Sequence, residues 1–224
     1  MSIKAVFFDL DGTLVDSLDD LRDAVNHMLS VFDRRALNAN EVRRLIGKGA
    51  RNLVQRALAT DSPEMVEQGL QLFTAYNAVH IADKSSLYPG TLEMLETLRG
   101  RGIRMAVISN KNEELCRLII RTLKIEEYFP IICGGDTFPA MKPSPLPLFE
   151  VLNRLQLYPY NSIMIGDSIN DIQAGKLARI TTIGCRWGYG NEEELIDADH
   201  RINSWPEAVS IMEIMSTSDH LKLG

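Results

Sequence analysis

The sequence has few cysteines and no excess of positive charge. Only 3 of its 224 residues are cysteines, and Cys116, Cys133 and Cys185 form no CxxC pair. Such an odd, widely spaced set suggests no disulfide framework, so we expect buried free thiols in a reducing cytoplasm. The net charge is −6, from 24 Lys and Arg against 30 Asp and Glu. This balance argues against nucleic-acid binding, which needs basic surfaces, but not against a small anionic substrate.

Long apolar segments are also missing. No run approaches the ~20 consecutive apolar residues that a membrane-spanning helix needs. The start, MSIKAVFFD, has no apolar segment followed by a small-residue cleavage site, so we expect no secretory signal. The expected location is therefore the cytoplasm, without a membrane partner, and the sequence leaves open whether the protein is a monomer or a homodimer. At ~150 residues per domain, the length fits one large domain, or a large one with a small insert.

Short apolar runs alternate with helical patterns along most of the chain. Runs rich in β-branched or aromatic residues are typical of buried strands, and strands that alternate with helices imply parallel pairing. The sequence thus predicts an α/β fold, a Rossmann-like parallel-sheet core with helices on both faces. A capping-box pattern from Ser204 to Glu207 predicts a last helix, and the polar tail from residue 216 is expected to fray. The expected strands cover residues 3–8, 104–108, 131–133, 162–165 and 181–184.

The segment between the first two expected strands is far longer than a crossover needs. It spans about residues 15–90, whereas a parallel connection takes roughly a dozen residues or more. Apolar residues recur in it at steps of three and four, which predicts several helices. We therefore expect a small α-helical cap at residues 16–86, inserted into an α/β core made of residues 1–15 and 87–224. Tyr88–Pro89–Gly90 marks the return to the core, and an insert of this kind can act as a lid.

Polar side chains follow four of the expected strands. In open α/β sheets, ligands bind outside the carboxyl ends of the strands, so these side chains should share one rim. The rim would combine carboxylates, a hydroxyl, an amide and a cation. Its expected members are Asp9, Asp11, Gly12 and Thr13 after the first strand, Ser109 and Asn110 after the second, Lys142 after the third, and Asp167 and Asp171 after the fourth.

This set of residue types suits the chemistry of phosphate esters. Clustered carboxylates repel one another, and Mg²⁺ relieves the repulsion while keeping positions open for a substrate phosphate. Lys142, the Ser109 hydroxyl and the backbone N–H groups of the Gly12–Thr13 turn can bind phosphoryl oxygens. Asp9 is a candidate nucleophile, and Asp11 can protonate the leaving oxygen and then deprotonate the attacking water. The structural alternatives are ordinary turns and helix caps at the same positions.

The motifs resemble those of the haloacid dehalogenase superfamily, in the same order, over residues 1 to about 212. The resemblance implies that Asp9 accepts the phosphoryl group and that Asp11 is the general acid and base, with its backbone carbonyl on Mg²⁺. It also implies that Asp9 and Asp167 are carboxylate ligands, that Asp171 ligates the metal directly or through water, and that the helical insert is the family's cap. The motifs are Asp9-x-Asp11-Gly12-Thr13-Leu14-Val15-Asp16-Ser17, Ser109-Asn110, Lys142-Pro143-x-Pro145 and Gly166-Asp167-Ser168-x-x-Asp171.

The resemblance also assigns the remaining phosphoryl contacts. Ser109 and Lys142 would bind the phosphoryl group, Lys142 would neutralise Asp9, and Asn110 would bind phosphoryl or substrate oxygens. Residues 44–58 of the cap are similar to those of phosphoglycolate phosphatases, as are Ser109-Asn110-Lys111 and the late Trp187-Gly188-Tyr189-Gly190. This likeness implies hydrolysis of 2-phosphoglycolate to glycolate. Lys48 or Arg51 would meet the substrate carboxylate, although Arg51 is equally well interpreted as a solvated helix charge.

Other functions fit parts of the same pattern. A sugar phosphomutase similar to β-phosphoglucomutase, or a phosphatase for another sugar or nucleotide phosphate, would carry nearly the same motifs. A dehalogenase would need neither a metal nor the second acid, so Asp11 and Asp167 count against it. A phospho-receiver module would lack the helical cap. The leading hypothesis is a Mg²⁺-dependent phosphatase that acts on a small phosphorylated metabolite through an aspartyl-phosphate.

Overall fold

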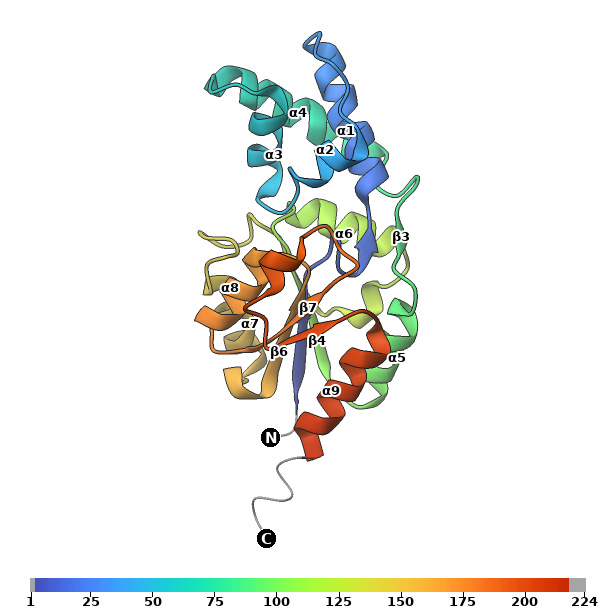
Figure 1. Ribbon diagram of the computed structural model, residues 1–224, viewed down its shortest axis with the longest axis vertical. Helices are drawn as coiled ribbons and strands as arrows, with labels where there is room; N and C mark the ends of the chain where they lie inside the picture. Colours follow the sequence, from blue (N-terminus) through green and yellow to red (C-terminus); the bar gives the residue numbers. More distant parts are fainter. Residues whose placement is uncertain (1–2, 218–224) are drawn as a thin grey trace.

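A computed structural model describes residues 3–217 as a parallel sheet flanked by helices, with four further helices above it (Figure 1). The sheet has six strands in the order β5-β4-β1-β6-β7-β8, and every pairing in it is parallel. This confirms the predicted fold class. The strands are β1 (Ala5–Phe8), β4 (Arg104–Ile108), β5 (Ile131–Cys133), β6 (Ser162–Gly166), β7 (Thr181–Cys185) and β8 (His200–Ile202).

The five strands expected from apolar runs are present, and the sixth was not predicted. Strand β8 has the sequence HRI, and only its last residue is buried. It lies at the edge of the sheet, paired with β7 alone. An edge strand with one buried side chain carries no apolar run, so periodicity does not reveal it.

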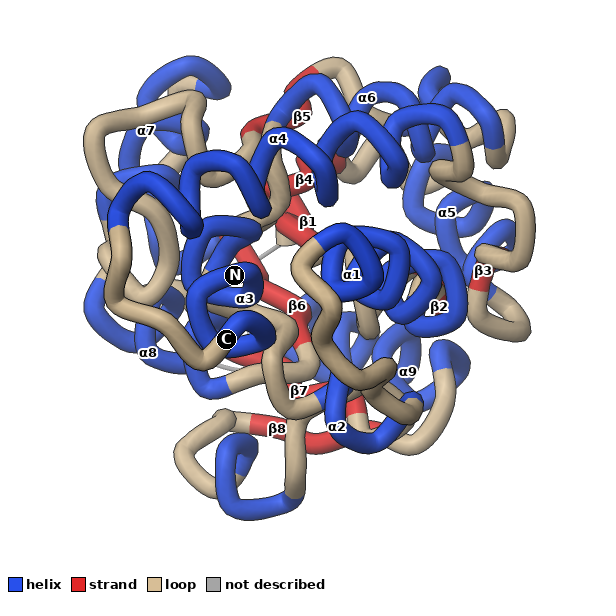
Figure 2. The backbone as a smooth tube through the Cα atoms, turned by 90° about the horizontal axis from the view of Figure 1, so that it is seen from above, coloured by secondary structure: helices blue, strands red, loops and turns tan. Residues whose placement is uncertain are grey.

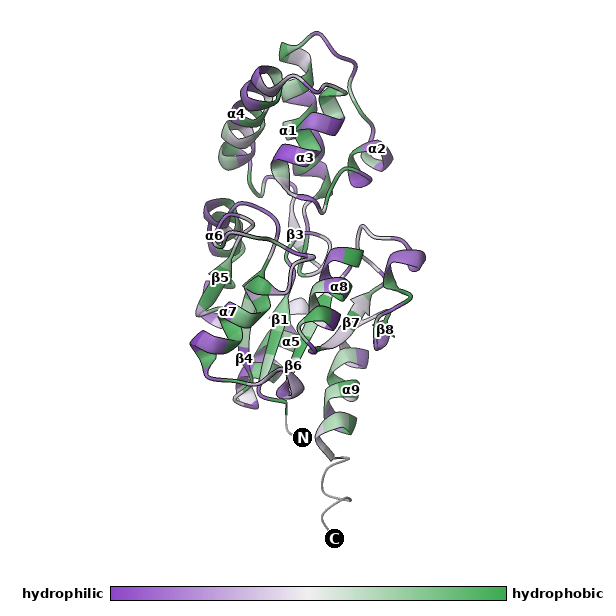
Figure 3. Cartoon of the chain, turned by 90° about the vertical axis from the view of Figure 1, so that its left-hand side faces the viewer, coloured by the Kyte–Doolittle hydropathy of each residue, from purple (hydrophilic) through white to green (hydrophobic). Residues whose placement is uncertain are grey.

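Helices cover both faces of the sheet because successive strand residues point to opposite sides. Val6 and Phe8 pack in one hydrophobic core with α5, α6 and α9, whereas Ala5 and Phe7 pack in another with α7 and α8. Figure 3 shows the strands and the inner sides of these helices as the apolar part of the molecule. The helices are α5 (Thr91–Gly100), α6 (Glu113–Thr122), α7 (Leu146–Leu155), α8 (Ile169–Leu177) and α9 (Trp205–Thr217).

The last helix begins where the capping-box pattern places it. Helix α9 starts at Trp205, and the Ser204 hydroxyl lies 3.0 Å from a carboxylate oxygen of Glu207. The expectation that the tail frays from residue 216 onward concerns residues that lie almost wholly outside the described ones. None of the described helices is both long and apolar enough to cross a membrane.

The segment between β1 and α5 forms four helices with a hydrophobic core of their own. They are α1 (Leu18–Val31), α2 (Ala39–Arg43), α3 (Gly49–Leu58) and α4 (Pro63–Val79). Two of them begin with ordinary capping chemistry: Asn38 and Glu41 form a capping box for α2, and the Ser62 hydroxyl caps α4, with Pro63 in its first turn.

The chain passes from the sheet to these helices and back through two short paired strands. Strands β2 (Val15–Asp16) and β3 (Ser86–Leu87) are antiparallel. Seen from above in Figure 2, helices α1, α3 and α4 lie over the sheet. Strand β1 rises from the N-terminal end of the molecule toward these helices (Figure 1), so the carboxyl ends of the strands face them. From here on we call residues 16–86 the helical unit.

Candidate active site

The parallel register brings the ends of the central strands to one level. Phe8 of β1 pairs with Val107 of β4 and with Ile165 of β6. The backbone N–H of Asp9 then donates to the Ile165 carbonyl at 2.9 Å, which continues the ladder by one residue. Residues that follow these strands are therefore neighbours in space although they are far apart in the sequence.

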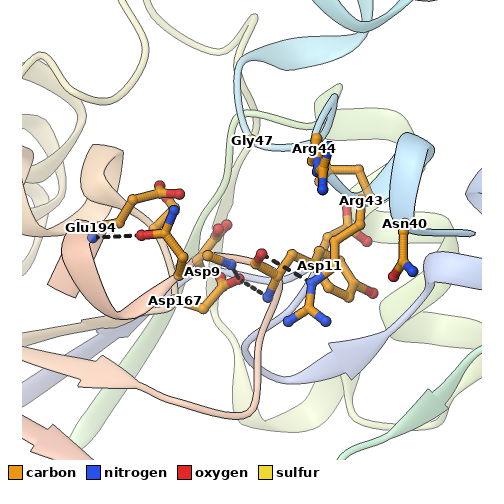
Figure 4. A pocket seen from close by; sticks show the side chains of 13 residues that line it. Asp9, Asp11, Asn40, Arg43, Arg44, Gly47, Asp167 and Glu194 are labelled. Atoms are coloured by element: carbon orange, nitrogen blue, oxygen red, sulfur yellow. Dashed lines mark hydrogen bonds between the residues drawn. The ribbon is translucent and has the colours of Figure 1, made fainter.

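Three carboxylates from two strand ends meet beneath the helical unit. Oxygens of Asp9, Asp167 and Asp171 all lie within 4.8 Å of one another, and all three residues are buried. Asp9 follows β1, Asp167 follows β6, and Asp171 stands in the first turn of α8. Figure 4 shows Asp9 and Asp167 side by side, with Asp11 next to them.

Lys142 is the buried cation of this cluster. Only 2% of it is exposed. Its ammonium lies 3.1 Å from Asp9 and 2.6 Å from Asp171, and it donates to the Ile108 carbonyl at 2.5 Å. Burial alone would lower the pKa of Lys142, but the charges of Asp171 and Asp9 outweigh burial and raise it. Lys142 therefore stays protonated and faces the carboxylate of Asp9.

One ammonium does not balance three carboxylates. Burial, together with the charge of Asp171, raises the pKa of Asp9 from 3.8 to about 6. Burial and the charges of Asp9 and Asp171 raise the pKa of Asp167 from 3.8 to about 8. A divalent cation with a preference for oxygen ligands would relieve each of these penalties, so the residues present fit a metal site.

The three carboxylates differ in their hydrogen-bond and ion-pair partners. Both oxygens of Asp171 are engaged: one accepts from Lys142, and the other accepts from the backbone N–H and hydroxyl of Ser168 at 3.1 and 2.7 Å. Asp171 thus closes a capping box at the start of α8 while it faces the cluster. Its position favours an indirect role at a metal, through Lys142 or water, over direct ligation.

Asp167 is oriented by groups from two other segments. Thr13 donates its hydroxyl to one oxygen at 3.0 Å, and the backbone N–H of Tyr189 donates to the other at 2.6 Å. A Cβ added at Gly12 or Gly188 would lie 2.3 or 2.2 Å from atoms of the Asp167 side chain. The Thr13 side chain, fully buried, therefore serves Asp167, and the 187–190 turn, which the sequence analysis did not assign to the site, is part of it.

Asp11 lies beside the cluster with a separate set of partners. Its carboxylate accepts from the Ser17 hydroxyl at 2.6 Å and lies 3.1 Å from the ammonium of Lys111. Asp9 and Asp11 line the same two cavities between the sheet and the helical unit. A substrate in either cavity would be within reach of both carboxylates.

Ser109 and Asn110 follow β4 and have different surroundings. Ser109 is 5% exposed and lines the smaller cavity next to Asp9. The Asn110 amide donates to the Lys142 carbonyl at 2.8 Å and to the Gly47 carbonyl of the helical unit at 2.9 Å. Ser109 thus shares a cavity wall with Asp9, whereas the amide nitrogen of Asn110 connects the sheet with the helical unit.

Two arginines that the sequence analysis did not single out face the larger cavity. This cavity has a volume of about 580 Å³, and Arg43 and Arg44 line it together with Asp9 and Asp11 (Figure 4). The Arg43 guanidinium also donates to the carbonyls of Gly188 and Tyr189, the second at 3.1 Å. Arg43 therefore ties the helical unit to the turn that orients Asp167.

The structure does not bring Lys48 and Arg51 to either cavity. Lys48 is exposed and stands at the position just before α3. The Arg51 side chain is 59% exposed, and its guanidinium lies 2.5 Å from Glu67 of α4. Arg51 falls on the outer side of α3, because Leu53 and Val54 take the inner side. The solvated helix charge is thus the interpretation of Arg51 that the structure favours.

Known proteins resemble this chain over nearly its whole length. A phosphoglycolate phosphatase from Neisseria meningitidis is 38% identical over 215 residues, covering 92% of each chain. A phosphoglycolate phosphatase from Chromobacterium violaceum is 36% identical over 217 residues, covering 94% of this chain and 97% of the relative. The crystal structure of a "predicted phosphoglycolate phosphatase" from Haemophilus somnus superposes with a TM-score of 0.90 at 30% identity, covering 94% of this chain and 98% of that one. The sequence profile of the haloacid dehalogenase-like hydrolases matches residues 6–185, and the chain belongs to that family.

Proposed function

We propose that the protein is a Mg²⁺-dependent phosphatase that hydrolyses a small phosphomonoester, with 2-phosphoglycolate as the leading substrate. The observation that carries the proposal is the contact of 3.1 Å between Lys142 and Asp9 inside a buried cluster of three carboxylates. It supports a carboxylate nucleophile with a cation beside it to receive phosphoryl oxygens. The relatives described as phosphoglycolate phosphatases support the choice of substrate.

Each residue of the site has its own role in the proposed reaction. Asp9 attacks the phosphorus in line, and Asp11 protonates the departing alkoxide. Asp11 then deprotonates the water that attacks the aspartyl-phosphate. Lys142 and Ser109 hold the phosphoryl oxygens throughout both steps. Mg²⁺, held by Asp9, Asp167 and the backbone carbonyl of Asp11, would neutralise charge on the phosphoryl group.

The helical unit serves as a lid in this proposal. Arg43 contacts the 188–189 carbonyls, and Gly47 accepts from Asn110 and Asn170 of the core side at 2.9 and 3.2 Å. These contacts support a closed arrangement that keeps bulk water away from the aspartyl-phosphate. Opening would break a handful of hydrogen bonds, while the hydrophobic core of the helical unit stays intact.

A second candidate function is a phosphomutase or phosphatase for a sugar phosphate. The larger cavity favours it, because about 580 Å³ lined by Arg43 and Arg44 can take a sugar with a second anionic group. In a mutase, a sugar hydroxyl rather than water would take the phosphoryl group from Asp9. Incubation with β-glucose 1-phosphate separates the two, since a mutase yields the 6-phosphate and a phosphatase yields free phosphate.

A panel of phosphorylated metabolites, assayed for released phosphate with Mg²⁺ and then with EDTA, tests the main proposal. We expect turnover of 2-phosphoglycolate with Mg²⁺, its loss with EDTA and its return with added Mg²⁺. Turnover that is indifferent to EDTA would overturn the metal assignment. Release of phosphate from no compound of the panel would overturn the proposed reaction.

A further inference from the structure

Helix α4 buries one polar residue on an otherwise apolar side. The buried positions of this helix are Val66, Gly69, Phe73 and Asn77, at the helical spacing of three and four residues. Asn77 is 1% exposed, and its Oδ1 has no hydrogen-bond partner among the residues that the structure describes. Buried amides nearly always have such a partner, so an unpaired one points to a group that the protein alone does not supply.

Asn77 lines the smaller of the two cavities at the site. On the side of the helical unit, the walls are largely apolar and include Leu21, Leu53 and Phe73. The opposite side is formed by Asp9, Asp11, Ser109 and neighbours that follow β4. The cavity thus connects the proposed phosphoryl-binding side chains with the unpaired amide.

The size of this cavity limits what it can hold. Its volume is about 60 Å³. At roughly 10–15 Å³ for each water-sized position, this is room for about four to six non-hydrogen atoms. That fits the leaving group of a two- or three-carbon ester and is too small for a sugar ring beyond the phosphate.

We propose that Asn77 binds the oxygen-bearing end of the substrate's leaving group in this cavity, and so selects short phosphomonoesters with a carboxylate or hydroxyl at that end. This inference rests on the proposed phosphatase function. The apolar walls accept the carbon chain, and the amide is the polar group of the helical unit that meets the far end. A half-turn of the amide presents either NH₂ to a carboxylate or oxygen to a hydroxyl.

A substitution of nearly equal shape, Asn77→Leu, tests the proposal with two matched substrates. Ethyl phosphate replaces the carboxylate of 2-phosphoglycolate by a methyl group and keeps the rest. We expect N77L to lower kcat/KM at least ~10-fold for 2-phosphoglycolate and to change it less than ~2-fold for ethyl phosphate, since only one of them loses a hydrogen bond. The free N77L protein should also melt at a higher temperature, because an unpaired buried amide is gone.

Asn52 provides the matched control. Its Oδ1 is likewise buried without a partner in the described chain, and it also belongs to the helical unit, but it does not line the cavity. N52L should therefore leave the ratio of kcat/KM for the two esters unchanged. A purely structural role for Asn77 predicts that N77L and N52L behave alike on both substrates, which would overturn the proposal.

A second variant keeps the test decisive if N77L folds poorly. Asn77→Asp preserves the shape but puts a negative charge beside the substrate's carboxylate, so the activity on 2-phosphoglycolate should fall much more than that on ethyl phosphate. Equal effects would overturn the inference while leaving the phosphatase proposal in place. If the unaltered protein with Mg²⁺ hydrolyses neither ester but releases phosphate from another compound of the panel, the inference fails and the phosphatase proposal stands. If it hydrolyses no compound of the panel, both fail.

Discussion

The rim of the sheet and the helical unit hold their polar groups in opposite ways. At the rim, Asp9, Lys142 and Asp171 are buried and bound to one another, and each has been fixed by folding. In the helical unit, Arg44 extends into an open cavity, and the amide of Asn77 is buried with an unpaired oxygen. The comparison indicates that the groups proposed for the reaction are preorganised on the sheet, whereas the groups proposed for recognition have no partner in the described chain before a ligand binds.

The sharpest way to test this comparison is to remove the proposed nucleophile. Asp9→Asn should lower kcat by at least ~10³-fold, because the amide cannot form the phosphoryl ester. The fold should persist, and the metal-free protein should melt no lower than the original, since one of three repelling carboxylates is removed. Phosphate-release kinetics and thermal melting measure both effects. Substantial remaining activity would exclude Asp9 as the nucleophile.

Asp20 is the matched control from the helical unit. It is also a buried carboxylate, but it accepts from the backbone N–H groups of Lys84 and Ser85 at 3.0 and 2.8 Å. Asp20→Asn should lower the melting temperature by several degrees, because hydrogen bonds to a charged group are worth ~1.5–3 kcal/mol. Its kcat should stay within about threefold. If Asp20→Asn abolished turnover, the division of tasks between the two regions would be wrong.

The second test concerns the charge of the rim. The pKa of Asp9 is raised to about 6 and that of Asp167 to about 8. The folded state then binds more protons than the unfolded state, so the stability of the metal-free protein should fall as the pH rises from about 4 to about 8. Mg²⁺ replaces those protons, so it should raise the melting temperature at about pH 8 by roughly 3 °C or more beyond its effect at about pH 5. A Mg²⁺ effect independent of pH would argue against these carboxylates as the metal site.

The third test separates two neighbouring arginines. Arg43 donates to carbonyls of the 187–190 turn, whereas Arg44 lines the larger cavity and is exposed. Arg43→Met should lower kcat/KM ~10-fold on every ester and raise the Mg²⁺ concentration for half activity, because the turn orients Asp167. Arg44→Met should raise KM only for substrates with a second anionic group. Identical profiles for the two variants would contradict the separate roles.

The smallest expected effect belongs to Arg51. Its guanidinium pairs with Glu67 on the surface of the helical unit, and such pairs contribute about 0–1 kcal/mol. Arg51→Ala should change KM for 2-phosphoglycolate less than ~2-fold. A selective rise in KM for carboxylated esters, without one for p-nitrophenyl phosphate, would instead support Arg51 as a substrate ligand and require α3 to move in the complex.

The sequence predicts the rim well because strand ends are a topological property. Once β1, β4 and β6 are recognised as parallel strands, Asp9, Ser109 and Asp167 must share an edge, whatever the details of packing. The hydrogen-bond partners of each residue are harder to predict from the sequence. Nothing in the sequence tells that the Thr13 hydroxyl turns to Asp167, or that Asn110 bonds to Gly47 across the boundary with the helical unit.

The helical unit is harder to predict because the sequence does not show which face of each helix turns toward the site once the helices have packed. Periodicity found the helices of residues 16–86, but it did not tell which arginine of residues 43, 44 and 51 faces the site. Asn77 does carry a signal, since a polar residue interrupts the apolar spacing of Val66 and Phe73. The 187–190 turn holds Asp167 and Arg43 through its backbone N–H and carbonyl groups, which every residue except proline offers, so the likeness of its sequence to other phosphatases did not tell that it lies at the site.

The turn at Gly188 has a consequence for the evolution of this chain. A Cβ there would lie 2.2 Å from the Asp167 side chain and 2.4 Å from the Gly12 carbonyl. Because Gly188 contributes only main-chain atoms and lies this close to its neighbours, substitution at this position is limited by volume and not by chemical character. Even alanine would displace the Asp167 carboxylate, so a lineage that acquires it would have to rearrange the 187–190 turn or give up this arrangement of Asp167.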